Sequence, residues 1–212
     1  PMTLIIMSEG LDLSMGAVLG LCGVALALAL VKGAGLAAAL GVALLVGSAF
    51  GFLNGVLVVT LGIPPFVATL GTLGIAQSVA LVATDGQSVV GIGEALPALY
   101  SSAFLGIPFP MLVAGLAYLP FHFLLYRPRF GACVFAIGGN REALVLAGVR
   151  AHGYHVAIYA FGGLTTGIAA LLLTARMNEA RSVHDLYLAS AELPRARGVD
   201  IPLPPTRLGP AP

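Results

Sequence analysis

The sequence predicts an all-α, polytopic transmembrane protein, a bundle of about five full spans with a disordered C-terminal tail. Of its 212 residues, 58% are hydrophobic and only 9% are charged, whereas about a quarter of a soluble domain is charged. No charged residue occurs between Gly33 and Thr84, and that stretch has room for two helices of roughly 20 residues each. The chain is therefore predicted to fold in a lipid bilayer.

Charge and cysteine content exclude several other classes. The net charge of +1 has no basic stripe behind it, so we expect no nucleic-acid partner. Cys22 and Cys133 fit neither a metal-ligand spacing nor a disulfide framework. No phosphate-binding loop or complete dinucleotide fingerprint is present. We therefore expect no catalytic centre and no metal site.

Five uncharged apolar segments are long enough to cross a membrane as helices. Only a helix satisfies its own backbone hydrogen bonds in lipid, whereas barrel strands would alternate over shorter runs. Residues 2–8 read as the end of a further span that is cut off. The five segments are about 13–31, 36–59, 64–83, 107–126 and 156–175.

A basic island at Arg127–Arg150 orients these spans. It holds four arginines and one acid, Glu142, and basic residues in short loops mark the cytoplasmic side. By parity, the loop 84–106, with only two charges, both acidic, lies outside and the turn at Leu61–Pro64 lies inside. Lys32, in the turn that then lies outside, is a single mild violation of this rule.

Glycines spaced four apart indicate helices that approach closely. Packing within one subunit is the favoured interpretation, and a seam between two copies is the alternative. The three sets are Gly16 and Gly20; Gly47, Gly51 and Gly55; and Gly163 and Gly167.

Polar residues at membrane depth are costly and therefore informative. Asp12 and Ser14 lie at the start of the first full span, where either could cap the helix. Equally, they could lie in a break between two half-helices, a feature of substrate sites in transporters. Asn54 and Gln77 are further candidates for a pathway, because hydroxyl side chains usually bond to their own helix. His122, two residues after Pro120, could face a pore or satisfy a kinked backbone.

The island also contains a predicted short helix. Gly138 and Gly139 allow a turn, Asn140 is a suitable N-cap, and Glu142 suits the positive end of the helix dipole. The apolar run that follows ends at Gly148, a typical C-terminal residue. Such a helix could dock in a groove of a cytoplasmic partner or lie flat on the membrane surface.

From residue 177 the composition changes. Charges return, six prolines fall in the last nineteen residues, and no apolar run could cross a membrane. Such a segment cannot bury enough apolar surface to fold alone. We therefore predict that residues 177–212 are disordered.

Three blocks of the chain resemble the permease subunits of bacterial sugar ABC importers, the ribose, xylose, arabinose and galactoside group. The first block is GLDLSMGAVLGLCGV, in which Asp12 and Ser14 match the family signature. The second is GFLNGVLVVTLGIPPFVATLGTLGIAQSVAL, in which Asn54 and Thr69, with Pro64 and Pro65, match. The third is RFGACVFAIGGNREALVLAGVR, the family's cytoplasmic loop. The blocks occur in the family's order and cover roughly residues 2–178.

The resemblance implies a multi-pass subunit of the bacterial inner membrane that passes a monosaccharide. It implies three partners: cytoplasmic ATPase subunits, a second permease copy and a periplasmic sugar-binding protein. ATP would be bound by a partner, so this chain would need no cofactor and would not be an enzyme. The family's ATPase-coupling loop corresponds to Gly138, Gly139, Asn140, Arg141, Glu142 and Ala143. The candidates for the translocation pathway are Asp12, Ser14, Asn54, Thr69 and Gln77.

The resemblance also suggests a fragment. The family has membrane sequence before Pro1 and further spans after Arg176, where this chain carries an unrelated segment. Residues 1–176 would form a partial membrane permease domain and 177–212 an atypical tail. An ion-coupled secondary transporter and a non-functional truncated remnant are the alternative interpretations.

Overall fold

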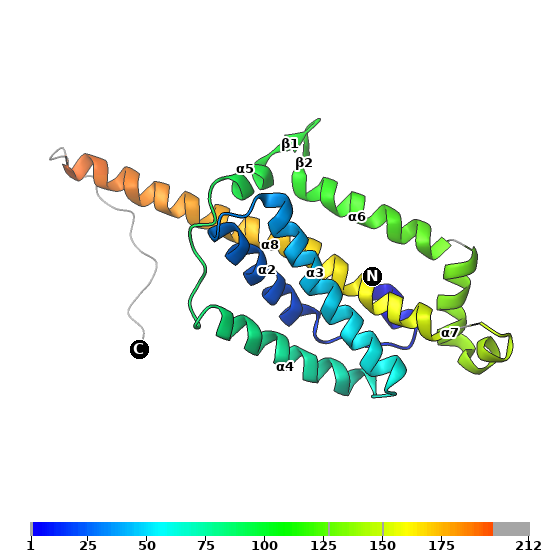
Figure 1. Cartoon of the computed structure of the whole chain (residues 1–212). Coiled ribbons are helices and arrows are strands. Elements are labelled where there is room, and N and C mark those ends of the chain that lie inside the picture. Colours follow the sequence, from blue (N-terminus) through cyan, green and yellow to red (C-terminus); the bar gives the residue numbers. More distant parts are fainter. Residues whose placement is uncertain (1, 127, 150, 197–212) are drawn as a thin grey trace, which may run out of the picture.

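The computed structural model describes residues 2–126, 128–149 and 151–196, and its regular structure is almost entirely helical (Figure 1). Among these residues, one two-stranded antiparallel hairpin pairs Ala103 with Pro108 and Phe104 with Ile107. The elements are α1 (Met2–Met7), α2 (Met15–Val31), α3 (Leu36–Gly55), η1 (Val56–Thr60), α4 (Pro65–Ala83), α5 (Ala95–Ser101), β1 (Ala103–Phe104), β2 (Ile107–Pro108), α6 (Phe109–Tyr126), α7 (Pro128–Leu146) and α8 (Ala151–Ala196).

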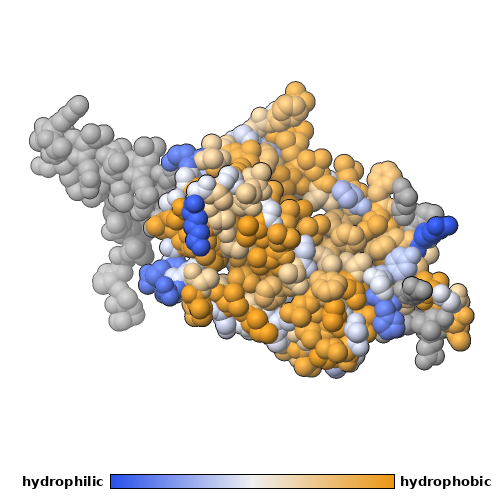
Figure 2. All heavy atoms as spheres, in the orientation of Figure 1, coloured by the Kyte–Doolittle hydropathy of each residue, from blue (hydrophilic) through white to orange (hydrophobic). Residues whose placement is uncertain are grey.

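The predicted all-α membrane bundle is confirmed. Among the described residues, four helical stretches are long and apolar enough to cross a membrane: Leu36–Thr60, Pro65–Ala83, Phe109–Tyr126 and Ala151–Met177. The first predicted span is a shorter apolar helix, α2, of 17 residues. Figure 2 shows hydrophobic side chains over the middle of the molecule and hydrophilic ones gathered toward its two ends. That distribution suits a bilayer crossed by these helices.

The last helix extends beyond the boundary predicted from composition. We expected order to end at residue 176, but α8 continues to Ala196. The extension is rich in alanine, glutamate, arginine and leucine and has no proline before Pro194. These residues favour helix propagation from an existing helix end. Residues 197–212 of the predicted tail lie outside the described residues.

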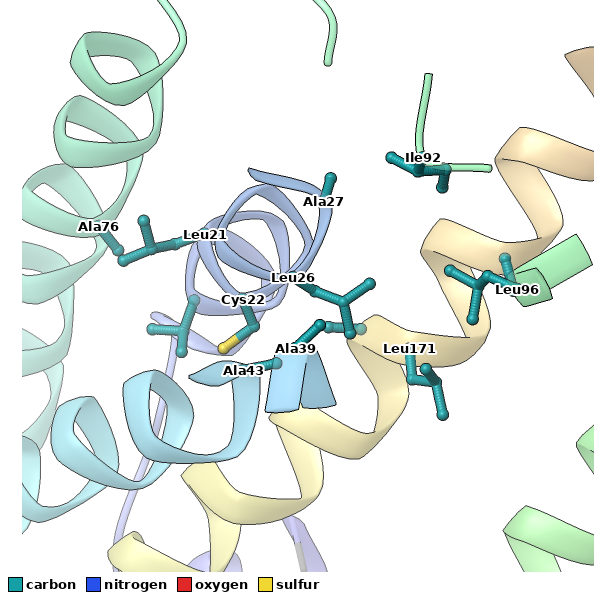
Figure 3. Packing of buried hydrophobic residues seen from close by; sticks show 13 residues of the cluster. Leu21, Cys22, Leu26, Ala27, Ala39, Ala43, Ala76, Ile92, Leu96 and Leu171 are labelled. Atoms are coloured by element: carbon teal, nitrogen blue, oxygen red, sulfur yellow. The ribbon is translucent and has the colours of Figure 1, made fainter. Parts of the chain in front are cut away.

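Helices α2, α3 and α8 form the core, with α4 packed against α2 (Figure 1). Figure 3 shows Cys22 and Leu26 of α2 directed toward α3, which carries Ala39 and Ala43, with Leu171 of α8 close by. Leu21 points the other way, toward Ala76 of α4. Small side chains on α3 allow the backbones to come close, so larger residues from α2 and α8 fill the space.

Glycines join α3 to α8 by backbone contact. A Cβ atom at Gly163 would overlap the carbonyl of Gly47, and one at Gly51 would overlap the carbonyl of Tyr159. These glycines therefore pack within one subunit, as the favoured interpretation held. Gly16 and Gly20 differ, because a Cβ at either position would meet nothing within 4 Å.

Candidate translocation site at a break between two helices

The chain leaves helical conformation between α1 and α2, in a segment where buried and exposed residues alternate. Helix α1 ends at Met7 and α2 begins at Met15, while Ser8, Asp12 and Ser14 are all buried. Ser14 occupies the N-cap position but makes no side-chain capping bond. Of the two interpretations left open by the sequence, the structure therefore shows the break between two helices.

Asp12 is the centre of the polar groups at this break. Its Oδ1 accepts hydrogen bonds from the Ser14 backbone N–H at 2.9 Å and from the Ser14 hydroxyl at 2.6 Å. Its Oδ2 accepts a longer bond from Asn54 Nδ2 at 3.4 Å. A carboxyl group held away from water needs such donors, because an unpaired buried charge is very costly.

Asn54 connects the break to α3 and α4. Its Nδ2 also donates to Ser14 Oγ at 2.8 Å, and its Oδ1 accepts from Thr72 Oγ1 at 2.7 Å. The nearby Thr69 hydroxyl bonds mainly to the Pro65 carbonyl of its own helix, at 2.8 Å, and approaches the Leu11 carbonyl at 3.4 Å. We call Asp12, Ser14, Asn54, Thr69 and Thr72 the polar clamp.

The polar clamp contains four of the five predicted pathway residues. Gln77, the fifth, is exposed on α4 and lies apart from it. Thr72 is a member that sequence reasoning dismissed, since a hydroxyl was expected to bond to its own helix. It does so, to the Thr69 carbonyl at 3.2 Å, but its shorter contact is with Asn54. The spacing of three residues between Thr69 and Thr72, which places both on one helix face, was the available signal.

Tyr159 of α8 is a second residue that the sequence did not reveal. Its side chain is fully buried, and its hydroxyl lies where a Cβ atom at Gly10 would come within 2.7 Å. Gly10 of the break thus packs directly against Tyr159 of α8. No local pattern marks a tyrosine for such a position.

The polar clamp lies inside the membrane-spanning part of the fold. Asn54 is six residues before the end of η1 at Thr60, and Thr72 is seven residues after Pro65. At a rise of 1.5 Å per residue, both are roughly 10 Å from the turn that joins α3–η1 to α4. Asp12, Ser14, Asn54 and Thr72 satisfy one another, and the Pro65 carbonyl satisfies Thr69, as groups at membrane depth must be satisfied by the protein itself.

Helix α7 contains the predicted loop helix. Asn140 has φ −160° and ψ 88° and so divides α7 into two helices. These angles are the extended conformation expected of an N-cap. After Leu146, Gly148 has φ +77° and the Val149 N–H bonds to the Leu144 carbonyl at 3.2 Å. That bond is characteristic of a Schellman C-cap. The start and end of the predicted loop helix are therefore confirmed.

The loop helix adjoins the break. A Cβ atom at Gly138 would overlap the Met7 carbonyl at the end of α1. Gly139 is exposed, whereas the side chains of Arg141, Glu142 and Ala143 lie outside the described part of the structure. Leu146 is almost fully exposed. The turn before the loop helix and the chain leading into the polar clamp are thus in direct backbone contact.

The broken helix and the buried polar clamp lie in a bundle of helices long enough to cross a membrane, an arrangement typical of transporters. The chain belongs to the family described as the permease component of the branched-chain amino acid transport system, whose model matches residues 1–192. We therefore place it in the bacterial inner membrane as a multi-pass protein.

Several curated proteins are similar to this chain. The D-allose transport system permease protein of Escherichia coli (strain K12) is 34% identical over 177 residues, which are 82% of this chain and 54% of the relative. The ribose import permease protein of Bacillus subtilis (strain 168) is 34% identical over 182 residues, 85% of this chain and 56% of the relative.

An autoinducer 2 import system permease protein of Enterobacter sp. (strain 638) is 34% identical over 188 residues, 86% of this chain and 58% of the relative. The chain thus spans about half the length of the curated relatives it matches. No solved structure matches it.

Proposed function

We propose that this chain acts as the permease subunit of an ATP-binding-cassette importer that passes a monosaccharide across the inner membrane. Support comes from the allose and ribose permeases among its relatives. The observation that carries the proposal is the contact between the turn before the loop helix and the end of α1. It offers a mechanical link from a cytoplasmic partner to a break inside the membrane.

The proposed assembly has three partners. Cytoplasmic ATPase subunits grip the loop helix at Gly138–Ala143, a second permease copy completes the pathway, and a periplasmic binding protein delivers the sugar. ATP is bound by the ATPase, so this chain carries no cofactor of its own and performs no chemical reaction.

In this proposal, a movement of the loop helix displaces α1 through the Gly138–Met7 contact. The polar clamp holds the start of α2 to α3 and α4, so the segment Ser8–Leu11, which joins α1 to the clamp, takes up the movement. The pathway role of Asp12, Ser14, Asn54 and Thr69 stays a prediction. Asp12, Ser14 and Asn54 are engaged with one another here, and the Thr69 hydroxyl is engaged with the Pro65 carbonyl, so a solute reaches them only when the break opens. Gln77, exposed on α4, is proposed separately as a pathway residue.

The test is transport in membrane vesicles that contain the protein expressed with its native gene neighbourhood. We expect uptake of labelled D-ribose or D-allose that requires ATP inside the vesicle, since hydrolysis there drives import. Uptake that requires a proton gradient but no ATP would establish the secondary-transporter alternative. No uptake of any aldose, with the ATPase and binding protein present, would favour the truncated remnant.

A further inference from the structure

A cavity of mixed polarity lies between α2, α8 and the segment that joins α4 to α5. Its volume is about 320 Å³, at the small end of the range of about 300–1,000 Å³ found for small-molecule sites. In Figure 1 the joining segment runs past the ends of α2 and α8. None of the described residues that line the cavity is charged. We call this space the α2–α8 cavity.

The α2–α8 cavity is at the end of the bundle opposite the loop helix. Helix α8 begins at Ala151, soon after the loop helix, and reaches the cavity at Leu173. The 22 residues between them span about 33 Å of helix, close to the thickness of a hydrocarbon core. On α2 the cavity wall begins at Leu19, five residues or about 8 Å beyond Ser14 of the polar clamp. In the proposed importer, this is the side of the clamp at which a solute arrives.

One side of the cavity offers hydrogen-bonding groups that the protein does not use. Thr174 of α8 is half-buried, yet within the described part of the structure its hydroxyl has no hydrogen-bond partner. Thr165 and Thr166 on the same helix instead donate to carbonyls of their own helix, as hydroxyls in membrane helices usually do. The exposed side chains of Gln87 and Ser88 add an amide and a second hydroxyl. Amides and hydroxyls both donate and accept hydrogen bonds, as the hydroxyls of a sugar do.

Glycines of α2 keep the cavity open. Gly20 and Gly23 are part of its wall. A Cβ atom at Gly20 would meet nothing within 4 Å, whereas one at Gly23 would come within 3.0 Å of the Thr174 hydroxyl. A side chain at either position would therefore take space from the cavity. Apolar side chains, among them Val24 and Ile92, complete the lining. A lipid chain would leave the polar side without partners, so an acyl chain is a poor occupant.

We propose that the α2–α8 cavity is an entry site for one neutral, polyhydroxylated molecule of monosaccharide size. The apolar side chains contact the C–H face of the ring, while Thr174, Gln87 and Ser88 exchange hydrogen bonds with its hydroxyls. The uncharged lining disfavours sugar phosphates and sugar acids, because no opposite charge offsets the cost of desolvating them. This proposal rests on the proposed function, to which it adds a first binding step before the polar clamp opens.

Protection of a thiol tests the proposal in the complete importer, purified in lipid nanodiscs whose two faces are open to solvent. The reporter is Val89→Cys in a Cys22→Ala/Cys133→Ala background, because Val89 lies in the cavity wall without being one of its hydrogen-bonding residues. Saturating D-ribose or D-allose should slow modification by a charged thiol reagent at least about fivefold, since an occupied cavity excludes the reagent. Polyethylene glycol at the same osmolality should have no effect. Modification that neither sugar slows would show a water-filled cavity only and would overturn the proposal, as would a thiol that the reagent does not reach.

Two matched pairs of variants in the reporter background locate the binding. Gly20→Leu fills the cavity and should abolish protection. Gly16→Leu, one turn away and also with nothing within 4 Å of a Cβ atom, should retain it. Thr174→Val removes the unpartnered hydroxyl and should weaken the apparent sugar affinity about fivefold, whereas Thr165→Val removes a hydroxyl bonded to its own helix and should leave the affinity unchanged. Equal behaviour within both pairs would overturn the cavity as the binding site.

The two proposals fail in different ways. Wild-type vesicles that take up no sugar with ATP would remove the proposed function, whatever the protection shows. ATP-driven uptake, together with a Val89→Cys thiol that neither sugar protects, would remove only the α2–α8 cavity as a binding site.

Discussion

Replacing Asn54 by alanine tests whether the polar clamp holds the break to α3 and α4. Asn54 is buried and makes three hydrogen bonds within the clamp. After truncation, the Thr72 hydroxyl can donate to the Thr69 carbonyl, and the Ser14 hydroxyl still donates to Asp12. Only Asp12 Oδ2 loses the one donor it has here.

The expected magnitude follows from this accounting. Hydrogen bonds between membrane helices contribute about 0.6 kcal/mol each on average, and two of the three Asn54 bonds are short. Leaving the Asp12 oxygen without its donor adds about 1 kcal/mol, the low end for an unsatisfied buried group. We therefore expect the free energy of unfolding to fall by about 2 kcal/mol, or roughly 4–8 °C in Tm for a chain of this length.

The assay is thermal unfolding of the protein purified in detergent micelles. Gln77→Ala is the matched control, because it removes an exposed amide from the neighbouring α4. It should change stability by less than about 0.5 kcal/mol. A double-mutant cycle of Asn54→Ala with Thr72→Val should give a coupling of about 0.6 kcal/mol. Equal Tm values for Asn54→Ala and wild type would refute the reasoning. So would equal losses of stability for Asn54→Ala and the control Gln77→Ala.

Three further predictions concern helix packing and the loop helix. Gly163→Leu should separate α8 from α3 and lower the free energy of unfolding by about 3 kcal/mol, measured by thermal unfolding. Arg141→Ala combined with Glu142→Ala should reduce co-purification of the ATPase about tenfold, equivalent to 1.4 kcal/mol of affinity. Gly148→Ala should cost about 1 kcal/mol, because φ is +77° there, and should lower Tm by a few degrees.

Each of these changes has a control or a contrary outcome. Gly153 lies on the same helix as Gly163, but it is exposed and a Cβ atom there would meet nothing within 4 Å, so Gly153→Leu should be tolerated. Undiminished recovery of the ATPase with the double alanine variant would count against the loop helix as its docking site. Gly139→Ala, at a glycine without a positive φ or a close neighbour, should leave Tm unchanged. A loss equal to that of Gly148→Ala would contradict the C-cap assignment.

The features that were predictable depend on residues close in the sequence. A span is recognised from the length of an apolar run, and the loop helix from Asn140 and Gly148 at its two ends. The polar clamp was only partly predictable. Asn54 stood out as an amide at membrane depth, but its partners Ser14 and Thr72 lie 40 and 18 residues away. Gln77 has the same chemistry as Asn54 and was indistinguishable from it until the fold placed it on an exposed face.

The sequence by itself determined the membrane environment, the helical class and the limits of the loop helix, because these follow from hydropathy and local capping. Tertiary structure alone decided that Asp12 lies in a break rather than at a simple helix start, since its hydrogen-bond partner Asn54 comes from another helix. It likewise decided that Gly138 contacts Met7 and that Gln77 is exposed on α4. Such arrangements depend on how helices rotate and pack against one another, which no local pattern of residues specifies.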